Sequence, residues 1–269
     1  MREPLKVGIL CLENSPLKEL FSIYLTHFEI PDGVEISFIQ VNKRVSQANI
    51  DRFNFRTMGM FQDMPRDNLL GFEKVLLESH IEQTSVNKIA RLNLDLGLNF
   101  GTHATLDSKV FDSFRYGILN CHPGNLPRYR GSCSLEWALH NSDAVVSTLH
   151  LMDQSVDTGP IIDKAIVSPD FKFTYFEFRA LIMWVAICQP MSYLAKLSLR
   201  PDVERLSSIS GVAQGVGKFW NPISDDFLTQ IIRDRTRVEG DQLALLRSFD
   251  IREWYSDLIE SNFSSFDFY

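Results

Sequence analysis

Apolar and polar positions along the first 122 residues follow two alternating periods. The apolar run LKVGILCL at residues 5–12 is typical of a buried strand, and the segment LKELFSIYLTHF after it spaces its apolar residues as a helix does. VEISFIQVN at residues 34–42 alternates apolar and polar positions and predicts a second strand. Residues 94–102 and 116–122 are predicted to be buried strands, with a short helix around SKVFDSF between them. Strands and helices therefore alternate along this part of the chain.

The segments that follow extend this alternation, whereas two earlier segments are less regular. SLEWALHN predicts a short amphipathic helix, AVVSTLHLMD and PIIDKAIVS predict strands, and TYFEFRALIMWVAICQPMSYLAKLS predicts one long helix. Residues 43–66 show no clean period, so we expect a long loop with short helical pieces there. The stretch NLLGFEKVLLESHIEQTS after this loop is interpreted as helical.

Alternating strands and helices predict an α/β fold that is doubly wound and Rossmann-like, with a mostly parallel sheet. Beyond residue 200 the composition changes to turn-rich segments such as SSISGVAQGVGKFWNPISDDF. We therefore predict a core over residues 1–200 and a small C-terminal appendage over residues 201–269. Ligands of such sheets bind outside the carboxyl ends of the strands, which is where residues 120–122 are expected.

Composition and charge narrow the class of protein. The chain has 269 residues, of which 45% are hydrophobic and 23% charged, which is enough for one sizeable core. The four cysteines form no CxxC pair or disulfide-framework spacing and no signal peptide opens the chain, so we expect a reduced, cytoplasmic protein. The net charge of −7 argues against nucleic acid as the principal partner. The longest apolar segment includes Gln189, Pro190 and Lys196, so we expect a buried helix and no membrane span.

The run GILNCHPGNLPRYRGS at residues 117–132 carries the strongest candidate for chemistry. His122 lies where a predicted strand turns into a loop stiffened by two prolines, and an imidazole exchanges protons near neutral pH. Residues two apart on a strand point to the same side, so Asn120 and His122 can face one small volume. Asp157 follows the next predicted strand, in the turn of DQSVDTGPII, and is expected at the same edge of the sheet. Asn, His and Asp side chains that meet at one point suit acyl transfer to an amine.

The chemistry of acyl transfer gives each of these side chains a task. When an amine attacks an acyl carbon, negative charge develops on the carbonyl oxygen and the new ammonium must lose a proton. The amide N–H of Asn120 and a protonated His122 can stabilise the oxyanion, an effect worth roughly 3 to 4 kcal/mol for each well-placed donor. Asp157 would orient the imidazole, favour its charged form and help take the proton. Cys121 should point to the opposite face of the strand and belong to the core.

The combination of LNCHPGNLPRYRG with the distant DQSVDTGPII resembles the formyltransferase family that uses N10-formyltetrahydrofolate. This family includes glycinamide ribonucleotide transformylase, methionyl-tRNA formyltransferase and the sugar N-formyltransferases, and it shares Asn-x-His-Pro, Leu-Pro, Arg/Lys-Gly and a distant Asp-x-Gly. The resemblance covers residues 5–200 loosely and residues 94–165 closely. It implies that the core is a formyltransferase catalytic domain with N10-formyltetrahydrofolate as the formyl donor. It also implies that Asn120, His122 and Asp157 are catalytic.

The resemblance further implies a folate pocket along GTHATL and along the turn that precedes the candidate aspartate. Six residues would form its wall: Gly101, Ala104, Leu106, Leu151, Asp153 and Val156. Some relatives have an arginine where this chain has Ala104, so the resemblance supports recognition of the pterin by backbone groups more than by that side chain. An ordinary strand-to-helix turn is the alternative interpretation of GTHATL.

Three histidines raise the alternative of a metal centre. His103, His122 and His150 could be imagined as a zinc set, but they lie on separate predicted strands and lack the short ligand spacing of zinc sites. We therefore expect no metal.

Sequence features outside the motif bear on the acceptor amine. The chain lacks the Gly- and Ser-rich first loop of a glycinamide ribonucleotide enzyme, because CLENSPLKEL follows the first strand. In residues 201–269 Asp and Glu outnumber Lys and Arg, unlike the basic C-terminal barrel of a methionyl-tRNA enzyme. A core with a modest appendage containing GVGKFWNPIS is similar to the sugar N-formyltransferases, which act on an amino group of a nucleotide-linked deoxy sugar. We therefore expect a nucleotide-diphosphate amino sugar as the acceptor.

Binding of a diphosphate and a flat base requires a few cationic donors and an aromatic surface. Arg128, Tyr129 and Arg130 directly follow the candidate histidine and are the expected substrate-binding residues. Bracing of the loop is an equal alternative for Arg130, and the basic segment KRVSQANIDRFNFR is another candidate contact. Three further aromatic residues are interpreted as core more readily than as stacking partners: Trp137, Phe219 and Trp220.

Fold does not fix function, so other activities stay open. The alternatives are a glycinamide ribonucleotide or other small-amine formyltransferase, a formyl-folate hydrolase, and a binding module without catalysis. The intact set of Asn120, His122 and Asp157 argues against the last of these. From the resemblance we also expect a homodimer, with exposed aromatic residues of the region 201–269 at its interface.

Overall fold

The computed structural model describes residues 3–64, 69–78, 83–102, 106, 108–167, 173–200 and 209–235. Its strands are β1 Leu5–Leu12, β2 Val34–Val41, β3 Glu73–Leu77, β4 Leu96–Phe100, β5 Ile118–His122, β6 Arg130–Gly131, β7 Val145–Leu151, β8 Ile161–Val167 and β9 Phe219–Trp220. Its helices are α1 Pro16–Leu25, α2 Gln47–Arg56, α3 Gln83–Ala90, α4 Ser108–Phe111, α5 Ser134–His140, α6 Tyr175–Ser198 and α8 Asp225–Arg235, with a 3-10 turn at Leu69–Gly71.

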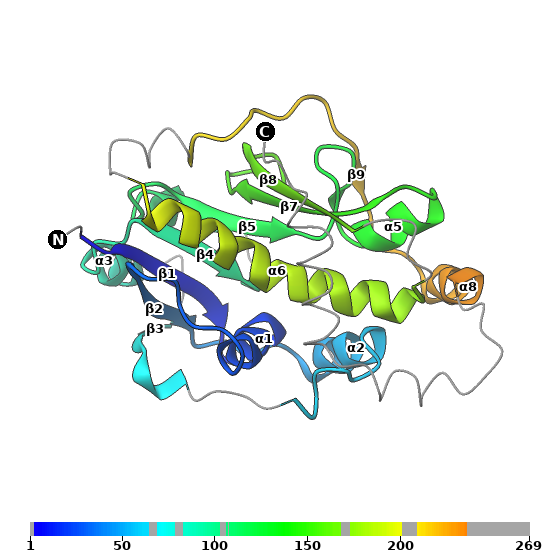
Figure 1. Ribbon diagram of the computed structural model, residues 1–269, viewed down its shortest axis with the longest axis horizontal. Helices are drawn as coiled ribbons and strands as arrows, with labels where there is room; N and C mark the ends of the chain where they lie inside the picture. Colours follow the sequence, from blue (N-terminus) through cyan, green and yellow to red (C-terminus); the bar gives the residue numbers. More distant parts are fainter. Residues whose placement is uncertain are drawn as a thin grey trace. The chain divides into compact units, whose positions relative to one another are not determined.

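Seven of these strands form one sheet in the order β3-β2-β1-β4-β5-β7-β8 (Figure 1). The strands from β3 to β5 pair in parallel, whereas β7 pairs antiparallel with both β5 and β8. The prediction of a doubly wound, mostly parallel α/β sheet is confirmed. The chain runs outward from β1 through β2 and β3 and returns to the other side of β1 with β4, so the strand order reverses between β1 and β4. Ligand sites of such sheets lie at this reversal, beyond the carboxyl ends of the strands.

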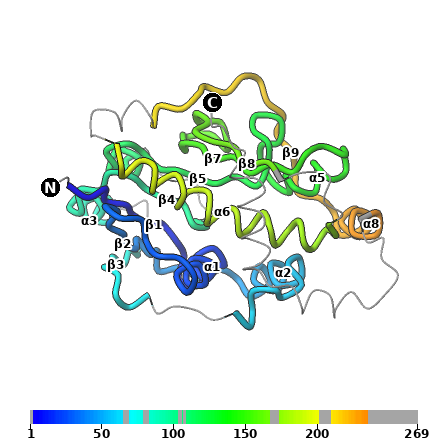
Figure 2. The backbone as a smooth tube through the Cα atoms, in the orientation of Figure 1, coloured from blue at the N-terminus to red at the C-terminus, as the bar shows by residue number. Residues whose placement is uncertain are grey.

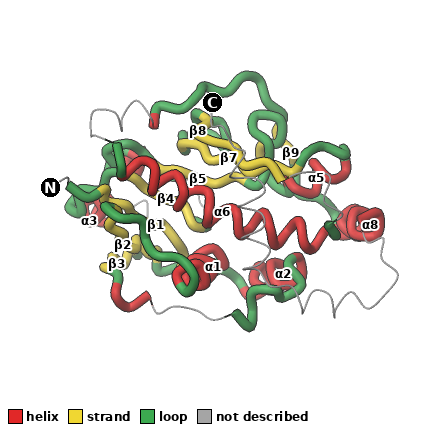
Figure 3. Tube along the Cα trace, viewed as in Figure 1, coloured by secondary structure: helices red, strands yellow, loops and turns green. Residues whose placement is uncertain are grey.

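Helices flank the sheet, which is drawn in yellow in Figure 3. On one face, α3 and α4 contribute Ile89 and Val110 to a buried apolar cluster with residues of the strands. On the other face, α1 contacts α6, and the ring of Phe21 in α1 lies 6.0 Å from that of Phe38 and 5.7 Å from that of Phe100. Because both faces are covered, the central parallel strands are nearly continuous apolar runs rather than alternating ones.

The 24-residue helix α6 lies in the core of the fold and runs from the side of α2 and α8 toward the side of the N-terminus (Figure 2). Thr174 and Glu177 start it with a capping box, in which each side chain accepts a hydrogen bond from the backbone N–H of the other residue. By length and composition α6 is the one described helix that could cross a membrane, yet 78% of its most apolar window is buried inside the protein. The prediction of a buried helix over this segment is confirmed.

The helical interpretation of NLLGFEKVLLESHIEQTS is wrong for its first half. Residues 69–71 form a single 3-10 turn, and Glu73–Leu77 form the edge strand β3, which pairs in parallel with β2. Leu77 is buried in the same apolar cluster as Ile39, whereas the first residues of β3 are exposed. Pairing with the free edge of β2 overrides the helical spacing of a short segment, because tertiary contacts outweigh local propensity.

Part of the stretch expected to be a loop with short helical pieces forms the ten-residue helix α2. The side chain of Ser46 caps this helix by accepting a hydrogen bond from the backbone N–H of Asn49 at 3.4 Å. None of the residues of α2 is fully buried, and the helix contacts α6. It therefore covers the carboxyl-end side of the fold as a half-exposed element.

The described part of the C-terminal region, residues 209–235, belongs to the same compact unit as the core. β9 pairs with β6, Val212 pairs with Ile161, and α8 contacts α5 and α6. Residues 201–208 and 236–269 lie outside the described residues. The predicted boundary at residue 200 and the predicted homodimer interface therefore stay predictions.

Candidate active site

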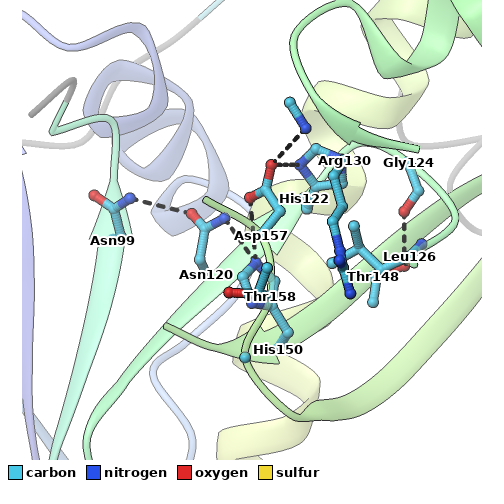
Figure 4. Close-up of polar contacts among 12 residues, drawn as sticks. Asn99, Asn120, His122, Gly124, Leu126, Arg130, Thr148, His150, Asp157 and Thr158 are labelled. Atoms are coloured by element: carbon cyan, nitrogen blue, oxygen red, sulfur yellow. Dashed lines mark hydrogen bonds and ion pairs between the residues drawn. The ribbon is translucent and has the colours of Figure 1, made fainter. Parts of the chain in front are cut away.

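The end of β5 and the turn between β7 and β8 bring the three candidate catalytic side chains together (Figure 4). Asn120 and His122 both lie on β5, and the pairing of β5 with β7 places Asn120 opposite His150. Asp157 lies in the turn after β7, and its carboxylate points toward the rings of both histidines. Two segments separated along the chain therefore converge as their positions at strand ends predict. The catalytic roles of these residues stay predictions.

His122 is 4% exposed and is held through both of its ring nitrogens. Nε2 lies 2.6 Å from the carbonyl oxygen of Tyr129 and 2.9 Å from Oγ of Ser134, and Nδ1 lies 3.3 Å from a carboxylate oxygen of Asp157. A carbonyl only accepts hydrogen bonds, so the contact with Tyr129 requires a hydrogen on Nε2. A second hydrogen on Nδ1 makes the ring an imidazolium that donates to Asp157. The geometry thus suits a positively charged His122 beside a carboxylate.

Asp157 combines an unusual backbone conformation with a shared carboxylate. Its φ of 55° lies in the left-handed region, which Asp tolerates better than most residues. Oδ2 accepts a hydrogen bond from the backbone N–H of Gly131 at 2.9 Å and also faces His122. Oδ1 lies 3.7 Å from Nε2 of His150. One side chain therefore ties the loop after β5 to both imidazole rings.

The amide of Asn120 is oriented from both ends. Its Oδ1 accepts a hydrogen bond from Nδ2 of Asn99 at 3.1 Å, and its Nδ2 lies 3.1 Å from Nε2 of His150. Burial lowers the pKa of His150, and this effect outweighs the opposite influence of Asp157. In a neutral His150 whose Nδ1 donates to the Leu151 carbonyl at 2.8 Å, Nε2 carries a lone pair that can accept from Asn120. Neither bond uses the second N–H of the Asn120 amide, which can then donate to a substrate oxygen.

Sequence reasoning missed Asn99, Ser134 and His150 as parts of this site. His150 stands out in the sequence only as a metal candidate, and its position opposite Asn120 follows from the antiparallel pairing of β5 with β7, which the sequence does not specify. Asn99 comes from the end of the neighbouring strand β4, and a lone Asn in an apolar run is a weak signal. Ser134 starts α5, where a serine is usually read as a cap.

Neither a group of metal ligands nor the thiol of Cys121 is arranged for chemistry at this edge of the sheet among the described residues. No group of three or more His, Cys, Asp or Glu side chains among them is arranged to hold a metal ion, and His103 lies outside the described residues. Cys121 faces away from the site, with Sγ 3.0 Å from Oγ of Ser147 and 3.2 Å from the amide oxygen of Gln189. Burial raises the pKa of this thiol to about 12, so it stays protonated as a core group.

The two segments expected to form the folate pocket lie side by side, although Ala104 is outside the described residues. Leu106 is 3% exposed and belongs to a buried apolar cluster against which Met152 also packs. Gly101 has a φ of 86°, and a Cβ at this position would lie 2.6 Å from Oγ of Ser15. The chain therefore passes close to the start of α1 in a conformation that favours glycine.

The turn on the other side of this pocket combines a rigid backbone with an exposed apolar side chain. A carboxylate oxygen of Asp153 accepts hydrogen bonds from the backbone N–H of Ser155 and the hydroxyl of Thr158. The backbone N–H of Leu151 donates to the carbonyl of the residue before β8, and Val156 is 55% exposed. The turn therefore presents an exposed apolar side chain on a backbone that hydrogen bonds hold in place.

The two arginines expected to bind substrate contact other protein groups. Arg128 forms an ion pair with Asp143 at 2.8 Å and remains 63% exposed. Arg130 donates to the side-chain oxygen of Gln214 at 2.9 Å and to the carbonyl of Gly215 at 3.1 Å. The interpretation of Arg130 as a brace of the loop is therefore favoured, while Arg128 keeps a free surface.

The aromatic residues near this loop pack mainly on one another. Tyr129 is fully buried, its hydroxyl contacts the carboxylate of Asp143, and its ring stacks on Trp220 at 5.6 Å. Its expected contact with substrate is therefore not supported, because the side chain is enclosed by protein. The ring of Trp137 lies 4.5 Å from that of Trp220 and 5.0 Å from that of Phe227, but both tryptophans are half-buried and lie outside the core. The side chain of Phe219, by contrast, is 55% exposed.

Residues 44–170 match the family model described as formyl transferase. A methionyl-tRNA formyltransferase of Agathobacter rectalis is 34% identical over 92 residues, which cover 33% of this chain and 30% of that protein. One of Borrelia garinii subsp. bavariensis is 35% identical over 123 residues, which cover 44% of this chain and 38% of that protein. The matched part thus amounts to about a third of the length of these curated relatives.

Solved structures of formyltransferases share the fold. A sugar N-formyltransferase from a Shewanella species aligns with a TM-score of 0.55 and 16% identity, over 88% of this chain and 89% of that chain. A phosphoribosylglycinamide formyltransferase from Bacillus halodurans aligns with a TM-score of 0.52 and 18% identity, over 72% of this chain and 96% of that chain. The segment that matches the family model includes all three converging side chains. Residues 44–170 therefore resemble the formyl transferase family, and the described fold is the one that solved formyltransferases share.

Proposed function

We propose that this protein transfers a formyl group from N10-formyltetrahydrofolate to an amine. The observation that carries the proposal is the carboxylate of Asp157, which faces the ring of His122 at 3.3 Å and that of His150 at 3.7 Å, while His150 in turn contacts the amide of Asn120. Such an arrangement provides an amide donor, a charged imidazole and a carboxylate around one small volume. These are the groups that acyl transfer to an amine requires.

In this proposal the donor, when bound, supplies an electrophilic formyl carbon that the acceptor amine attacks. The free N–H of Asn120 donates to the formyl oxygen as negative charge develops there. Both ring nitrogens of His122 face protein groups, so an imidazolium at this position would act through its positive charge rather than as a hydrogen-bond donor. The carboxylate of Asp157 faces the ring of His122 and takes the proton from the attacking amine, directly or through water. As the bond between the formyl carbon and N10 breaks, that proton passes to N10 and tetrahydrofolate leaves. No protein side chain becomes covalently modified, which agrees with a Cys121 that faces the core.

Residues of two segments would hold the donor. Gly101 and Leu106 would lie on one side, and the turn from Leu151 through Asp153 to Val156 on the other; contact of Leu106 and Met152 with one apolar cluster supports this placement, because it fixes the separation of the two segments. The pterin would then lie against the edge of the sheet that carries the site.

For the acceptor we propose an amino group of a nucleotide-linked deoxy sugar. The net charge of −7 and the acidic composition of residues 201–269 support a small acceptor over a long polyanion such as tRNA. Exposed Arg128 beside the loop after β5 is one group that can contact a phosphate. A cytoplasmic location and a homodimer complete the proposal.

Incubation of the protein with formyl donor, with and without nucleoside-diphosphate amino sugars, tests the activity. Release of tetrahydrofolate that depends on the amino sugar, together with a mass gain of one formyl group on the sugar, is the expected result. Release without any acceptor would indicate a hydrolase, and glycinamide ribonucleotide as the better acceptor would replace the sugar. Absence of release with every acceptor would overturn the proposed transfer.

A further inference from the structure

A cavity of about 420 Å³ lies between the start of α1, the helix α2 and the first turns of α6. Its wall includes Ser15 at the start of α1, Gly101 after β4, and three arginines. Arg52 and Arg56 come from α2 and Arg179 comes from α6. No acidic residue is among the described residues of this wall. We call Arg52, Arg56 and Arg179 the arginine pocket.

One buried carboxylate holds two of the three guanidinium groups in place. Glu136 of α5 is fully buried, and one of its oxygens lies 3.4 Å from Arg56 and 3.6 Å from Arg179. The hydroxyl of Tyr175 donates to the same oxygen at 2.8 Å. Burial alone would raise the pKa of Glu136, but the two guanidinium groups lower it below its usual value, so the carboxylate stays charged.

The carboxylate of Glu136 does not use up the charge or the donors of the arginine pocket. Three guanidinium groups against one carboxylate leave an excess of positive charge at the cavity. Nε of Arg56 and Nε of Arg179 find no hydrogen-bond partner among the described residues, and neither does the second oxygen of Glu136. The side chain of Arg52 is exposed and contacts only the polar side chain of Asn49 among the described hydrogen bonds. The two Nε atoms are buried, but the side chains of Arg56 and Arg179 remain 12% and 16% exposed, so an anion in the cavity would pair with the exposed parts of these guanidinium groups and with Arg52.

The arginine pocket borders the candidate active site on two sides. On one side, Arg56 lies 3.9 Å from Sγ of Cys133, and the next residue, Ser134, contacts the ring of His122. On the other side, Gly101 follows β4 closely after Asn99, which holds the amide of Asn120. A ligand with its anionic part among the arginines would therefore extend toward the amide and the imidazole.

We propose that the arginine pocket binds the phosphate or diphosphate group of the acceptor amine, and that Glu136 is the positioning residue for Arg56 and Arg179. This proposal rests on the proposed function, because it assigns a ligand to the same site. Guanidinium groups from two helices can bind phosphate oxygens in pairs, and the excess charge suits a group with more than one negative charge. The amino-terminal end of the ten-residue helix α1 adds a partial positive charge to the same wall.

Titration with inorganic pyrophosphate tests the arginine pocket without any transfer reaction. Isothermal titration should detect binding to the wild-type protein, and Arg179→Gln and Arg52→Gln should each weaken it at least about tenfold, which corresponds to about 1.4 kcal/mol. Arg115→Gln is the matched control, because Arg115 is an exposed arginine paired with Asp95 far from the cavity wall. The Arg52→Gln variant keeps the test valid if loss of the buried pair impairs folding of Arg179→Gln. Equal pyrophosphate affinity in all four proteins would overturn the proposal.

The formyl donor also carries carboxylates, so a second measurement distinguishes the two sources of negative charge. In Arg52→Gln, the affinity for the formyl donor should stay at the wild-type value while KM for the acceptor rises. A loss of donor affinity with unchanged acceptor KM would assign the arginine pocket to the donor and overturn the proposal. If pyrophosphate binds through these arginines but no formyl group is transferred, the proposed function fails while the anion site stands.

Discussion

Replacement of Asp157 by Asn isolates the role of one negative charge in the candidate site. An Asn side chain can keep its oxygen toward the backbone N–H of Gly131, where the carboxylate accepts at 2.9 Å, and present its NH2 group to His150. The shape of the turn should therefore survive. Only the charge that faces Nδ1 of His122 at 3.3 Å is lost.

Two magnitudes follow from this geometry. A hydrogen bond to a charged group contributes about 1.5 to 3 kcal/mol and a neutral one about 0.5 to 1.5 kcal/mol, so the Asp157→Asn change should lower the free energy of unfolding by about 1 to 1.5 kcal/mol. Loss of a proton acceptor in the transition state should lower turnover by about 10² to 10⁴, or about 2.7 to 5.4 kcal/mol of barrier. The kinetic effect should thus clearly exceed the effect on stability.

The assay is release of tetrahydrofolate as a function of pH, with donor affinity measured separately by calorimetry. The variant should bind the donor nearly as well as the wild type, whereas its turnover should be lower at every pH measured. Asp95→Asn is the matched control, because it makes the same change on a carboxylate that pairs with Arg115 and accepts from the backbone N–H of Lys6, and that has no role in the candidate site. Turnover of Asp157→Asn within threefold of the wild type, with an unchanged pH profile, would refute the assigned role.

Three further substitutions test other contacts of the site. His150→Gln should flatten the pH dependence of stability on the acid side. Burial lowers the pKa of the folded His150, so the stability of the wild type is complete above the unfolded value of 6.5 and declines as pH falls below it. An equal loss of the free energy of unfolding between pH 7.5 and 5.5 in variant and wild type, measured by urea titration, would contradict this. Gly124→Ala should lower turnover and the melting temperature, since its Cβ would lie 2.5 Å from Cβ of Ser134 and 2.8 Å from Nε2 of His122. An unchanged melting temperature and unchanged kinetics would show that neighbouring atoms shift without cost. Tyr129→Phe should lower the free energy of unfolding by about 1 to 3 kcal/mol, because the Asp143 carboxylate loses the hydrogen bond from the buried hydroxyl. A change below about 0.3 kcal/mol in denaturant titrations, which is on the order of measurement error, would argue against this hydrogen bond.

Local pattern was sufficient for the central strands and for the candidate catalytic set. The strands β1 and β4 are buried on both faces and their sequences are nearly continuous apolar runs, whereas β2 was predicted from its alternation of apolar and polar positions. Asn120 and His122 lie two positions apart on one strand, and Asp157 lies in a turn with strong turn residues. The alternation of side chains along a strand and the residue types of a turn were therefore enough to predict where these three side chains lie.

Long-range pairing accounts for what the sequence did not reveal. The edge strand β3 has one well-buried residue, and its identity as a strand depends on the free edge of β2. The arginine pocket joins Arg56 and Arg179, which are far apart in sequence, through Glu136 of a third segment. No short window contains such a cluster, because each member is an ordinary helix residue on its own.

The ladder between β6 and β9 makes the loop after His122 depend on a segment near the end of the described chain. Arg130 and Gly131 pair with Phe219 and Trp220, and the indole N–H of Trp220 donates to the carbonyl of Arg128. A protein shortened to residues 44–170, the span that matches the family model, would lose the pairing of β6 with β9 and also the strands β1 and β2. Transfer of this loop to another protein scaffold therefore requires transfer of the segment around Phe219 and Trp220 as well.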